Sequence, residues 1–266
     1  MALLGATISA PALRGLGLVC ILCITLLVVA AIFTSYWICR RLKLPRRMSI
    51  LIACGNSICG NSAIAAVAPV IGADGCEVAA SISFTAILGV AVVLGIPVVA
   101  VALAMSPMSF GVFAGLTVYA VPQVLAATAS VSPLSVQVGT LVKLVRVLML
   151  GPVVFVLAMM ARRWNDPQGG AVTPPRPKVL QLIPAFIIAF LALMVCRSEG
   201  WIPTGALEPI SHMTTLLTVI SMAALGLDVD VRALAGAGVR VTGAVVLSLL
   251  SLGAGALLII HLLRLY

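Results

Sequence analysis

The sequence predicts an all-α protein, a polytopic bundle of transmembrane helices. Of its 266 residues, 62% are hydrophobic and only 9% are charged, whereas a soluble domain carries about 25% charged residues. A soluble fold of this length could not hide so much apolar surface. The whole chain, 1–266, is therefore interpreted as a single integral membrane domain whose main partner is the lipid bilayer. Soluble enzymes, secreted domains and disordered proteins are excluded.

Eight segments are predicted to cross the membrane, since a crossing helix needs about 20 apolar residues. Their approximate bounds are 16–38, 48–71, 77–104, 109–129, 135–161, 179–197, 211–228 and 238–263. The first segment is longer than the core of a cleavable signal peptide and ends in two arginines, so it is predicted to stay in the mature protein. The Pro- and Gly-rich connector 162–178 separates a first group of helices, 1–161, from a second, 179–266.

The distribution of charge predicts the orientation of the chain. Residues 40–47 carry five basic side chains and the connector 162–178 carries four. Cytoplasmic loops are rich in Lys and Arg, so both segments are predicted on the cytoplasmic face of the inner membrane. The loop 72–77, which contains Asp74 and Glu77, is predicted on the opposite face. A nucleic-acid partner is not expected despite the net charge of +9, because no aromatic side chains interleave with the basic clusters.

A weak internal repeat indicates inverted-repeat character. Residues 4–17 align with residues 225–238, with Gly5 against Gly226, and the predicted orientation places the two copies on opposite faces. The first copy has almost nothing before it, so we expect further helices ahead of it in a complete architecture. The alternative is a shorter protein with an amphipathic start.

The predicted span 48–71 contains a signal for a broken helix. Its middle reads CGNSICGNS, which places Asn56, Ser57, Asn61 and Ser62 at membrane depth. Glycine weakens a helix, and Asn or Ser can cap a new one. The N-terminus of a half-helix then offers N–H groups and a partial positive charge to an anion. Close packing of an unbroken helix through its small residues is the alternative.

The predicted span 109–129 contains a second candidate break. Residues 115–123 read GLTVYAVPQ, where Pro122 lacks a backbone donor and Gln123 adds a polar side chain. Gly115 aligns with Gly55 of the first break, and Thr117 then aligns with Ser57. A purely structural proline kink is the alternative.

Two basic residues, Lys143 and Arg146, lie inside the predicted span 135–161. Their spacing puts them on one face of a helix. Ionisable groups at this depth usually face a cavity or a partner, and no acidic residue lies well inside a predicted span. This pattern favours an anionic substrate. Snorkelling of both side chains toward the outer interface is the alternative.

No catalytic, cofactor or metal site is predicted, and the chain is not expected to be an enzyme. Cys20 and Cys23 form a C-x-x-C, but this motif lies within a span and has no second pair of ligands. No hydrolase, metalloprotease or phosphate-binding motif occurs.

The segment Gly55–Ala66, GNSICGNSAIAA, resembles the G-x-S-I-C-G-x-x-A-I-x-A motif of the YeiH-type UPF0324 membrane proteins, a family of proposed sulfate exporters. Softer matches extend over the whole chain: FGVFAG at 110–115, VPQV at 121–124, KLVRV at 143–147 and MAALGL at 222–227.

The resemblance implies a multi-pass inner-membrane transporter with inverted repeats, acting on sulfate- or sulfonate-like anions. The chain departs from the family pattern in two places. Family members begin with further helices, whereas Met1–Gly5 resembles the interior of one. They also carry H-E-V-A-Q where this chain has YAVPQ at 119–123, so only Gln123 carries over and a proton-linked role is in doubt.

The primary hypothesis is a secondary transporter that exports a small anion by alternating access, with no cofactor and with a homo-oligomer as a compatible assembly. Its candidate substrate-binding residues are Asn56, Ser57, Asn61, Ser62, Thr117, Gln123, Lys143 and Arg146. The alternative is a non-transporting membrane scaffold or a decayed paralogue of such a transporter.

Overall fold

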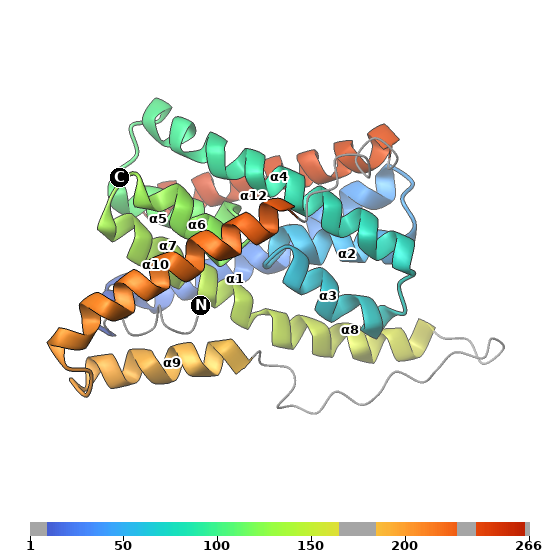
Figure 1. The fold of residues 1–266 in the computed structure, drawn as a ribbon. Helices are drawn as coiled ribbons and strands as arrows, with labels where there is room; N and C mark the ends of the chain where they lie inside the picture. The colour runs from blue at the N-terminus through green and yellow to red at the C-terminus, as the bar shows by residue number, and fades with distance from the viewer. Residues whose placement is uncertain (1–9, 165–184, 228–237, 264–266) are drawn as a thin grey trace.

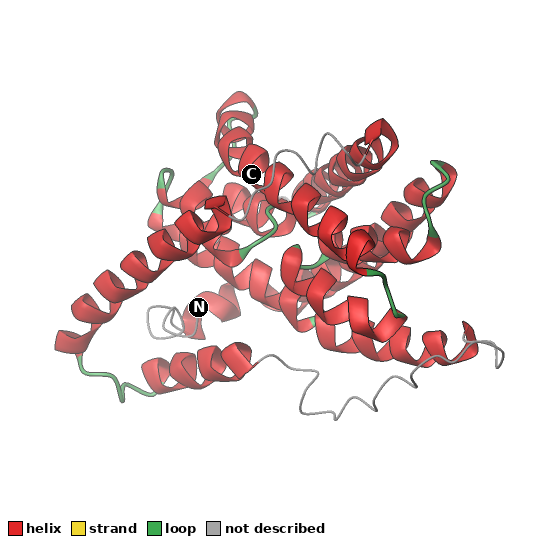
Figure 2. Cartoon of the chain, turned by 45° about the vertical axis from the view of Figure 1, so that its right-hand side comes forward, coloured by secondary structure: helices red, strands yellow, loops and turns green. Residues whose placement is uncertain are grey.

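The chain folds into a bundle of helices in the computed structural model, which describes residues 10–164, 185–227 and 238–263 (Figures 1 and 2). No strand occurs in these ranges, and the all-α prediction is confirmed. In chain order the helices are α1 Ala10–Arg41, α2 Arg46–Ser57, α3 Asn61–Ile71, α4 Gly75–Ala102, α5 Pro107–Thr117, α6 Val121–Ala129, α7 Pro133–Leu148, α8 Leu150–Trp164, α9 Ala185–Ser198, α10 Thr204–Leu227 and α12 Gly238–Leu262.

Within the described ranges, four stretches are long and apolar enough to cross a membrane: Val19–Arg41, Gly75–Ala102, Pro133–Ala161 and Arg240–Leu262. Each has large apolar side chains on its outer surface, such as Leu26, Val98 and Leu250. Such side chains are stable in contact with lipid, so they mark the bilayer-facing sides of the bundle.

Helices α5 and α6 form a hairpin that folds back on itself. The hydroxyl of Ser135, at the start of α7, donates to the carbonyl of Pro107, at the start of α5, over 2.7 Å. Further along both helices, a Cβ at Gly115 would lie 2.6 Å from the carbonyl oxygen of Gly139. Helices α5 and α7 therefore run parallel and begin at the same end of the bundle. Since α6 leads directly into α7, it must return to the end from which α5 entered.

Helices α2 and α3 form a second hairpin of the same kind. Gly72, at the end of α3, lies against the guanidinium of Arg47, at the start of α2. Near the turn, a Cβ at Gly55 of α2 would lie 3.0 Å from Ile64 Cδ1 of α3. Both helices are too short to cross a bilayer, at 12 and 11 residues, or about 18 Å and 16 Å. The hairpin therefore enters and leaves through one face.

The two hairpins enter from opposite faces and meet near mid-depth. Helix α4 has 28 residues, about 42 Å, and links the end of α3 to the start of α5. Its ends must lie on opposite faces, and so must the bases of the hairpins (Figure 1). The segments 48–71 and 109–129 are thus broken as predicted, but neither continues across the membrane. The loop 72–77 consequently lies on the same face as 40–47, and its predicted opposite placement was wrong.

The hairpins and the spans that follow them form an inverted repeat. Helix α2 ends at Ser57 and α3 begins at Asn61, while α5 ends at Thr117 and α6 begins at Val121, so both boundaries recur 60 residues later. Each hairpin is followed by a span, α4 or α7–α8, that runs in the opposite direction to its counterpart. Inverted-repeat character thus appears within 46–164. The copies predicted at 4–17 and 225–238 lie largely outside the described residues.

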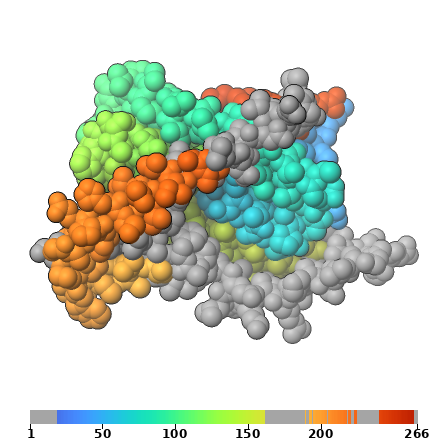
Figure 3. Space-filling model, viewed as in Figure 1, coloured from blue at the N-terminus to red at the C-terminus, as the bar shows by residue number. Residues whose placement is uncertain are grey.

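The remaining helices pack around this repeat. Helix α12 lies against α1 and α5, and α10 crosses the face formed by α4 and α6 (Figure 3). The predicted spans 179–197, 211–228 and 238–263 correspond to α9, α10 and α12. Most of the connector 162–178 lies outside the described residues.

Candidate functional site

The tips of the two hairpins, residues 56–60 and 116–120, meet around a pair of fully buried basic side chains. Lys143 and Arg146 project from α7, ten and thirteen residues after its first residue, about 15 Å and 20 Å along the helix. Both are 0% exposed. Because the hydrocarbon core is about 30 Å thick, this position is near its middle, and snorkelling to the interface is excluded.

Lys143 joins the two tips through one carbonyl of each. Its ammonium donates to the carbonyl of Ile58 over 2.7 Å and to that of Val118 over 2.8 Å. Ile58 follows the last residue of α2, and Val118 follows the last residue of α5. The two acceptors occupy equivalent positions of the repeat, so the ammonium bridges the hairpins.

Arg146 binds several further carbonyls of the same helix ends. Its Nε and Nη2 donate to the carbonyls of Ser57 and Asn56, each over 3.1 Å. Its Nη1 contacts the carbonyls of Gly115, Leu116 and Val118. The last carbonyls of a helix have no partner within the helix, and the lipid core offers them none. The guanidinium therefore supplies the donors that allow both helices to end inside the membrane.

The net charge at the tips is positive. Each tip joins a helix C-terminus to a helix N-terminus, and the partial charges of about half an elementary charge cancel. The formal charges of the Lys143 and Arg146 side chains are therefore not offset by the helix ends. The acidic side chains in the described ranges are Asp74, Glu77, Glu199 and Glu208, and none of them binds either cation.

Three buried polar atoms at the tips have no hydrogen-bond partner among the described residues: Asn56 Oδ1, Ser57 Oγ and Tyr119 Oη. Each of these side chains is at most 2% exposed. Leaving such a group unpaired costs about 1–3 kcal/mol, so these three atoms could each bind a further polar group.

The orientation of the Asn56 side chain is fixed by its neighbour. Its Nδ2 donates to the carbonyl of Val245 in α12 over 3.3 Å. A flipped amide would place two acceptors against each other. Oδ1 is therefore the unpaired atom, and it presents an acceptor at the tip.

The other sequence-predicted residues have local roles. Thr117 donates its hydroxyl to the carbonyl of Phe113, and Gln123 Oε1 accepts from the N–H of Ala120 over 3.1 Å. Asn61 accepts from the hydroxyl of Thr85 in α4. Ser62 is exposed and does not join the buried group.

The hydrogen bonds of the cations differ from the sequence-based expectation. The predicted arrangement presented half-helix N-termini to the substrate, with Lys143 and Arg146 adding positive field. In the structure, both cations bind half-helix C-termini. Tyr119 was not among the predicted site residues. Its polar hydroxyl, within an apolar segment that was predicted to be broken, could have identified it as a candidate.

Comparison with known proteins agrees with this membrane architecture. The family described as "Conserved hypothetical protein 698" matches residues 1–245. A UPF0324 membrane protein of Brucella suis biovar 1 is 57% identical over 263 residues, which cover 99% of this chain and 76% of the relative. A UPF0324 membrane protein of Bradyrhizobium diazoefficiens is 52% identical over 259 residues, covering 97% and 72%.

A more distant relative is a UPF0324 membrane protein of Bacillus cereus, which is 33% identical over 201 residues. The match covers 76% of this chain and 58% of the relative. No solved structure matches the chain.

Proposed function

This chain belongs to the UPF0324 family of membrane proteins, and we propose that it carries a small anion across the membrane by alternating access. The observation that carries the proposal is the pair of buried cations, Lys143 and Arg146, beside three unpartnered polar groups. Buried charge in a membrane is costly and is typically found at substrate or ion pathways. A bound anion would neutralise this charge and satisfy the unpaired donors.

The available donors suit an oxyanion such as a sulfate or sulfonate. Lys143 has three N–H donors and uses two, while Arg146 Nη2 has two and uses one toward the described residues. The hydroxyls of Ser57 and Tyr119 are also unpaired. These four donors belong to the two cations and to residues at the helix ends that they bind, and together they would match the several acceptor oxygens of such an anion.

Asn56 adds a preference among anions. Its unpaired Oδ1 is an acceptor, which would repel a bare oxygen of the ligand but bind an O–H or N–H. We therefore expect hydrogen sulfite or an amino-sulfonate such as taurine to bind better than sulfate, which carries no donor near neutral pH.

The opposed hairpins provide a route for alternating access. One hairpin separates the site from one face, and the other hairpin separates it from the opposite face. The full burial of both cations corresponds to an occluded state. Movement of either hairpin would open the site to one face only, as alternating access requires.

Flux into proteoliposomes tests the proposal with radiolabelled sulfate, sulfite and taurine as probes. Ser57→Ala and Tyr119→Phe remove unpaired hydroxyls, so each variant should fold at least as stably as the native protein while its flux falls about tenfold. Thr140→Val is the control, because the hydroxyl of Thr140 is already bonded to the carbonyl of Val136 over 2.7 Å. Equal flux in the native protein and in both site variants would overturn the proposal.

A second candidate is a non-transporting membrane scaffold. It is favoured by the bonding of Lys143 and Arg146, since every acceptor that the structure gives them is a main-chain carbonyl. If the protein is a scaffold, Lys143 and Arg146 only hold the two hairpins together. A native protein that binds none of the three probes and shows no flux above empty liposomes would support the scaffold.

A further inference from the structure

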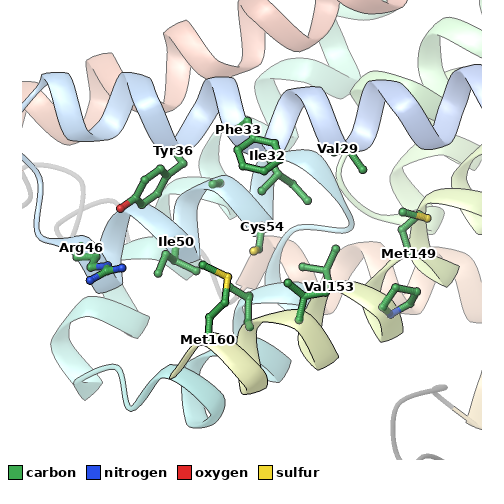
Figure 4. Close-up of a pocket in the computed structure, with 14 residues that line it drawn as sticks. Val29, Ile32, Phe33, Tyr36, Arg46, Ile50, Cys54, Met149, Val153 and Met160 are labelled. Carbon is green, nitrogen blue, oxygen red and sulfur yellow. The ribbon is translucent and has the colours of Figure 1, made fainter. Parts of the chain in front are cut away.

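An apolar groove lies on the outer surface of the bundle, between α1, α2 and α8. Its volume is about 410 Å³. Figure 4 shows side chains from all three helices pointing into it, including Phe33 of α1, Cys54 of α2 and Val153 of α8. Arg46 is the one charged residue of its lining.

The groove is one leaflet deep. Its lining runs from Met149, the residue before α8, to Met160 in α8, a distance of about 16 Å. Half of the hydrocarbon core is about 15 Å. The deep end, at Cys54, lies three residues before the end of α2, and the shallow end lies at Arg46.

The shallow end has the residues of a membrane interface. Tyr36 lines it, and the neighbouring Trp37 stacks under the guanidinium of Arg41 at 4.2 Å. Tyr and Trp are enriched at the level of lipid headgroups. The exposed basic side chains at this end are Arg40, Arg41, Lys43, Arg46 and Arg47.

We propose that this groove binds one acyl chain of an anionic phospholipid, with the phosphate at the basic end near Arg46. The length of the groove, about 16 Å, matches half of the hydrocarbon core, which is the depth that an acyl chain of one leaflet occupies. The cluster of five basic residues selects a negatively charged headgroup.

The proposal is independent of anion transport and is tested by native mass spectrometry of the full chain with phosphatidylglycerol and phosphatidylcholine. Val156→Trp fills the groove from an exposed lining position, and adducts of phosphatidylglycerol should fall about tenfold. Val98→Trp is the matched control on α4, since Val98 is 68% exposed against 52% for Val156 and does not line the groove. It should leave the adducts unchanged.

The headgroup is tested separately by Arg46→Gln. This variant should lose about fivefold in its preference for phosphatidylglycerol over phosphatidylcholine, while still binding both lipids. Arg240→Gln is the control, because Arg240 is exposed but does not line the groove. Unchanged adducts in Val156→Trp would overturn the proposal. A change of oligomeric state in that variant with unchanged adducts would also overturn it, and would assign the groove to a second copy of the chain.

Discussion

The tip of the α2–α3 hairpin and the tip of the α5–α6 hairpin have the same length and the same register, yet they carry different side chains. Asn56 and Ser57 of the first tip correspond to Leu116 and Thr117 of the second. Asn56 Oδ1 and Ser57 Oγ are unpaired among the described residues, whereas the Thr117 hydroxyl is bonded within its own helix. The backbone of the repeat is thus symmetric, whereas the unpaired polar atoms are not: two lie in the first tip and one, Tyr119 Oη, lies in the second.

The spans that follow the hairpins differ even more. Lys143 lies ten residues after the start of α7, and Thr85 lies ten residues after the start of α4. The Thr85 side chain reaches the α2–α3 hairpin through Asn61. Lys143 contacts both tips. One half of the repeat therefore supplies the cations on which both hairpins depend.

The comparison requires that the two hairpins enter from opposite faces, and thiol labelling tests this with an all-or-none result. Cys76 is exposed at the start of α4, on the face of the 40–47 loop. An impermeant maleimide should label Cys76 and the variant Lys43→Cys from one side of oriented vesicles. The variant Val131→Cys should label from the other. Labelling of Cys76 from the side of Val131→Cys would contradict the α2–α3 hairpin.

The dependence of both tips on α7 predicts the largest loss of stability. Arg146→Met leaves buried carbonyls of both hairpins without donors, so the protein should lose about 3–5 kcal/mol of unfolding free energy, or fail to fold. Lys143→Met removes one hydrogen bond to each tip and should cost less unfolding free energy. Thermal unfolding in detergent measures both. A greater loss in Lys143→Met would contradict the assignment of Arg146 as the main support.

The equivalent glycines, Gly55 and Gly115, should differ in their tolerance of a methyl group. A Cβ at Gly115 would lie 2.6 Å from the rigid main chain of Gly139, whereas at Gly55 it meets the movable end of Ile64 at 3.0 Å. Gly115→Ala should therefore destabilise by about 1–3 kcal/mol, and Gly55→Ala by less. Equal shifts in thermal unfolding would show that α5 and α7 are not in close contact.

The cap of the second hairpin gives the smallest expected effect. Gln123 accepts from the N–H of Ala120, a bond that the corresponding Ala63 of the first hairpin cannot make. Gln123→Leu should cost about 1 kcal/mol in thermal unfolding. Ala63→Leu is unsuitable as a control because Ala63 is fully buried. Ala65→Leu is used instead, since Ala65 is exposed. A loss in Ala65→Leu equal to that in Gln123→Leu would remove the evidence for a cap.

The sequence predicted where the helices break but not how they continue. The CGNSICGNS segment and Pro122–Gln123 predicted interruptions that the structure places at 58–60 and 118–120. A kinked span and a hairpin require the same weak helix formers at the break. They differ in the contacts of distant residues, such as Ser135 with Pro107, and no local pattern specifies those contacts.

The sequence also identified the cations without their partners. A basic pair within an apolar span predicted a special environment for Lys143 and Arg146. Their acceptors are main-chain carbonyls far away in sequence, which belong to every residue type and leave no signature. The role of these residues in binding a substrate stays a prediction, as do those of Asn56 and Ser57.

The fold-back of two segments also has a consequence for mapping by reporter fusion. When two membrane-crossing helices are replaced by two hairpins, the number of crossings falls by two. A reporter fused anywhere after α8 is therefore on the same face of the membrane in both topologies. Enzymatic reporters fused after α8 would thus agree with a hydropathy plot that counts too many membrane crossings. Only a probe inserted between the hairpins, in the short loops next to α4, distinguishes the two topologies.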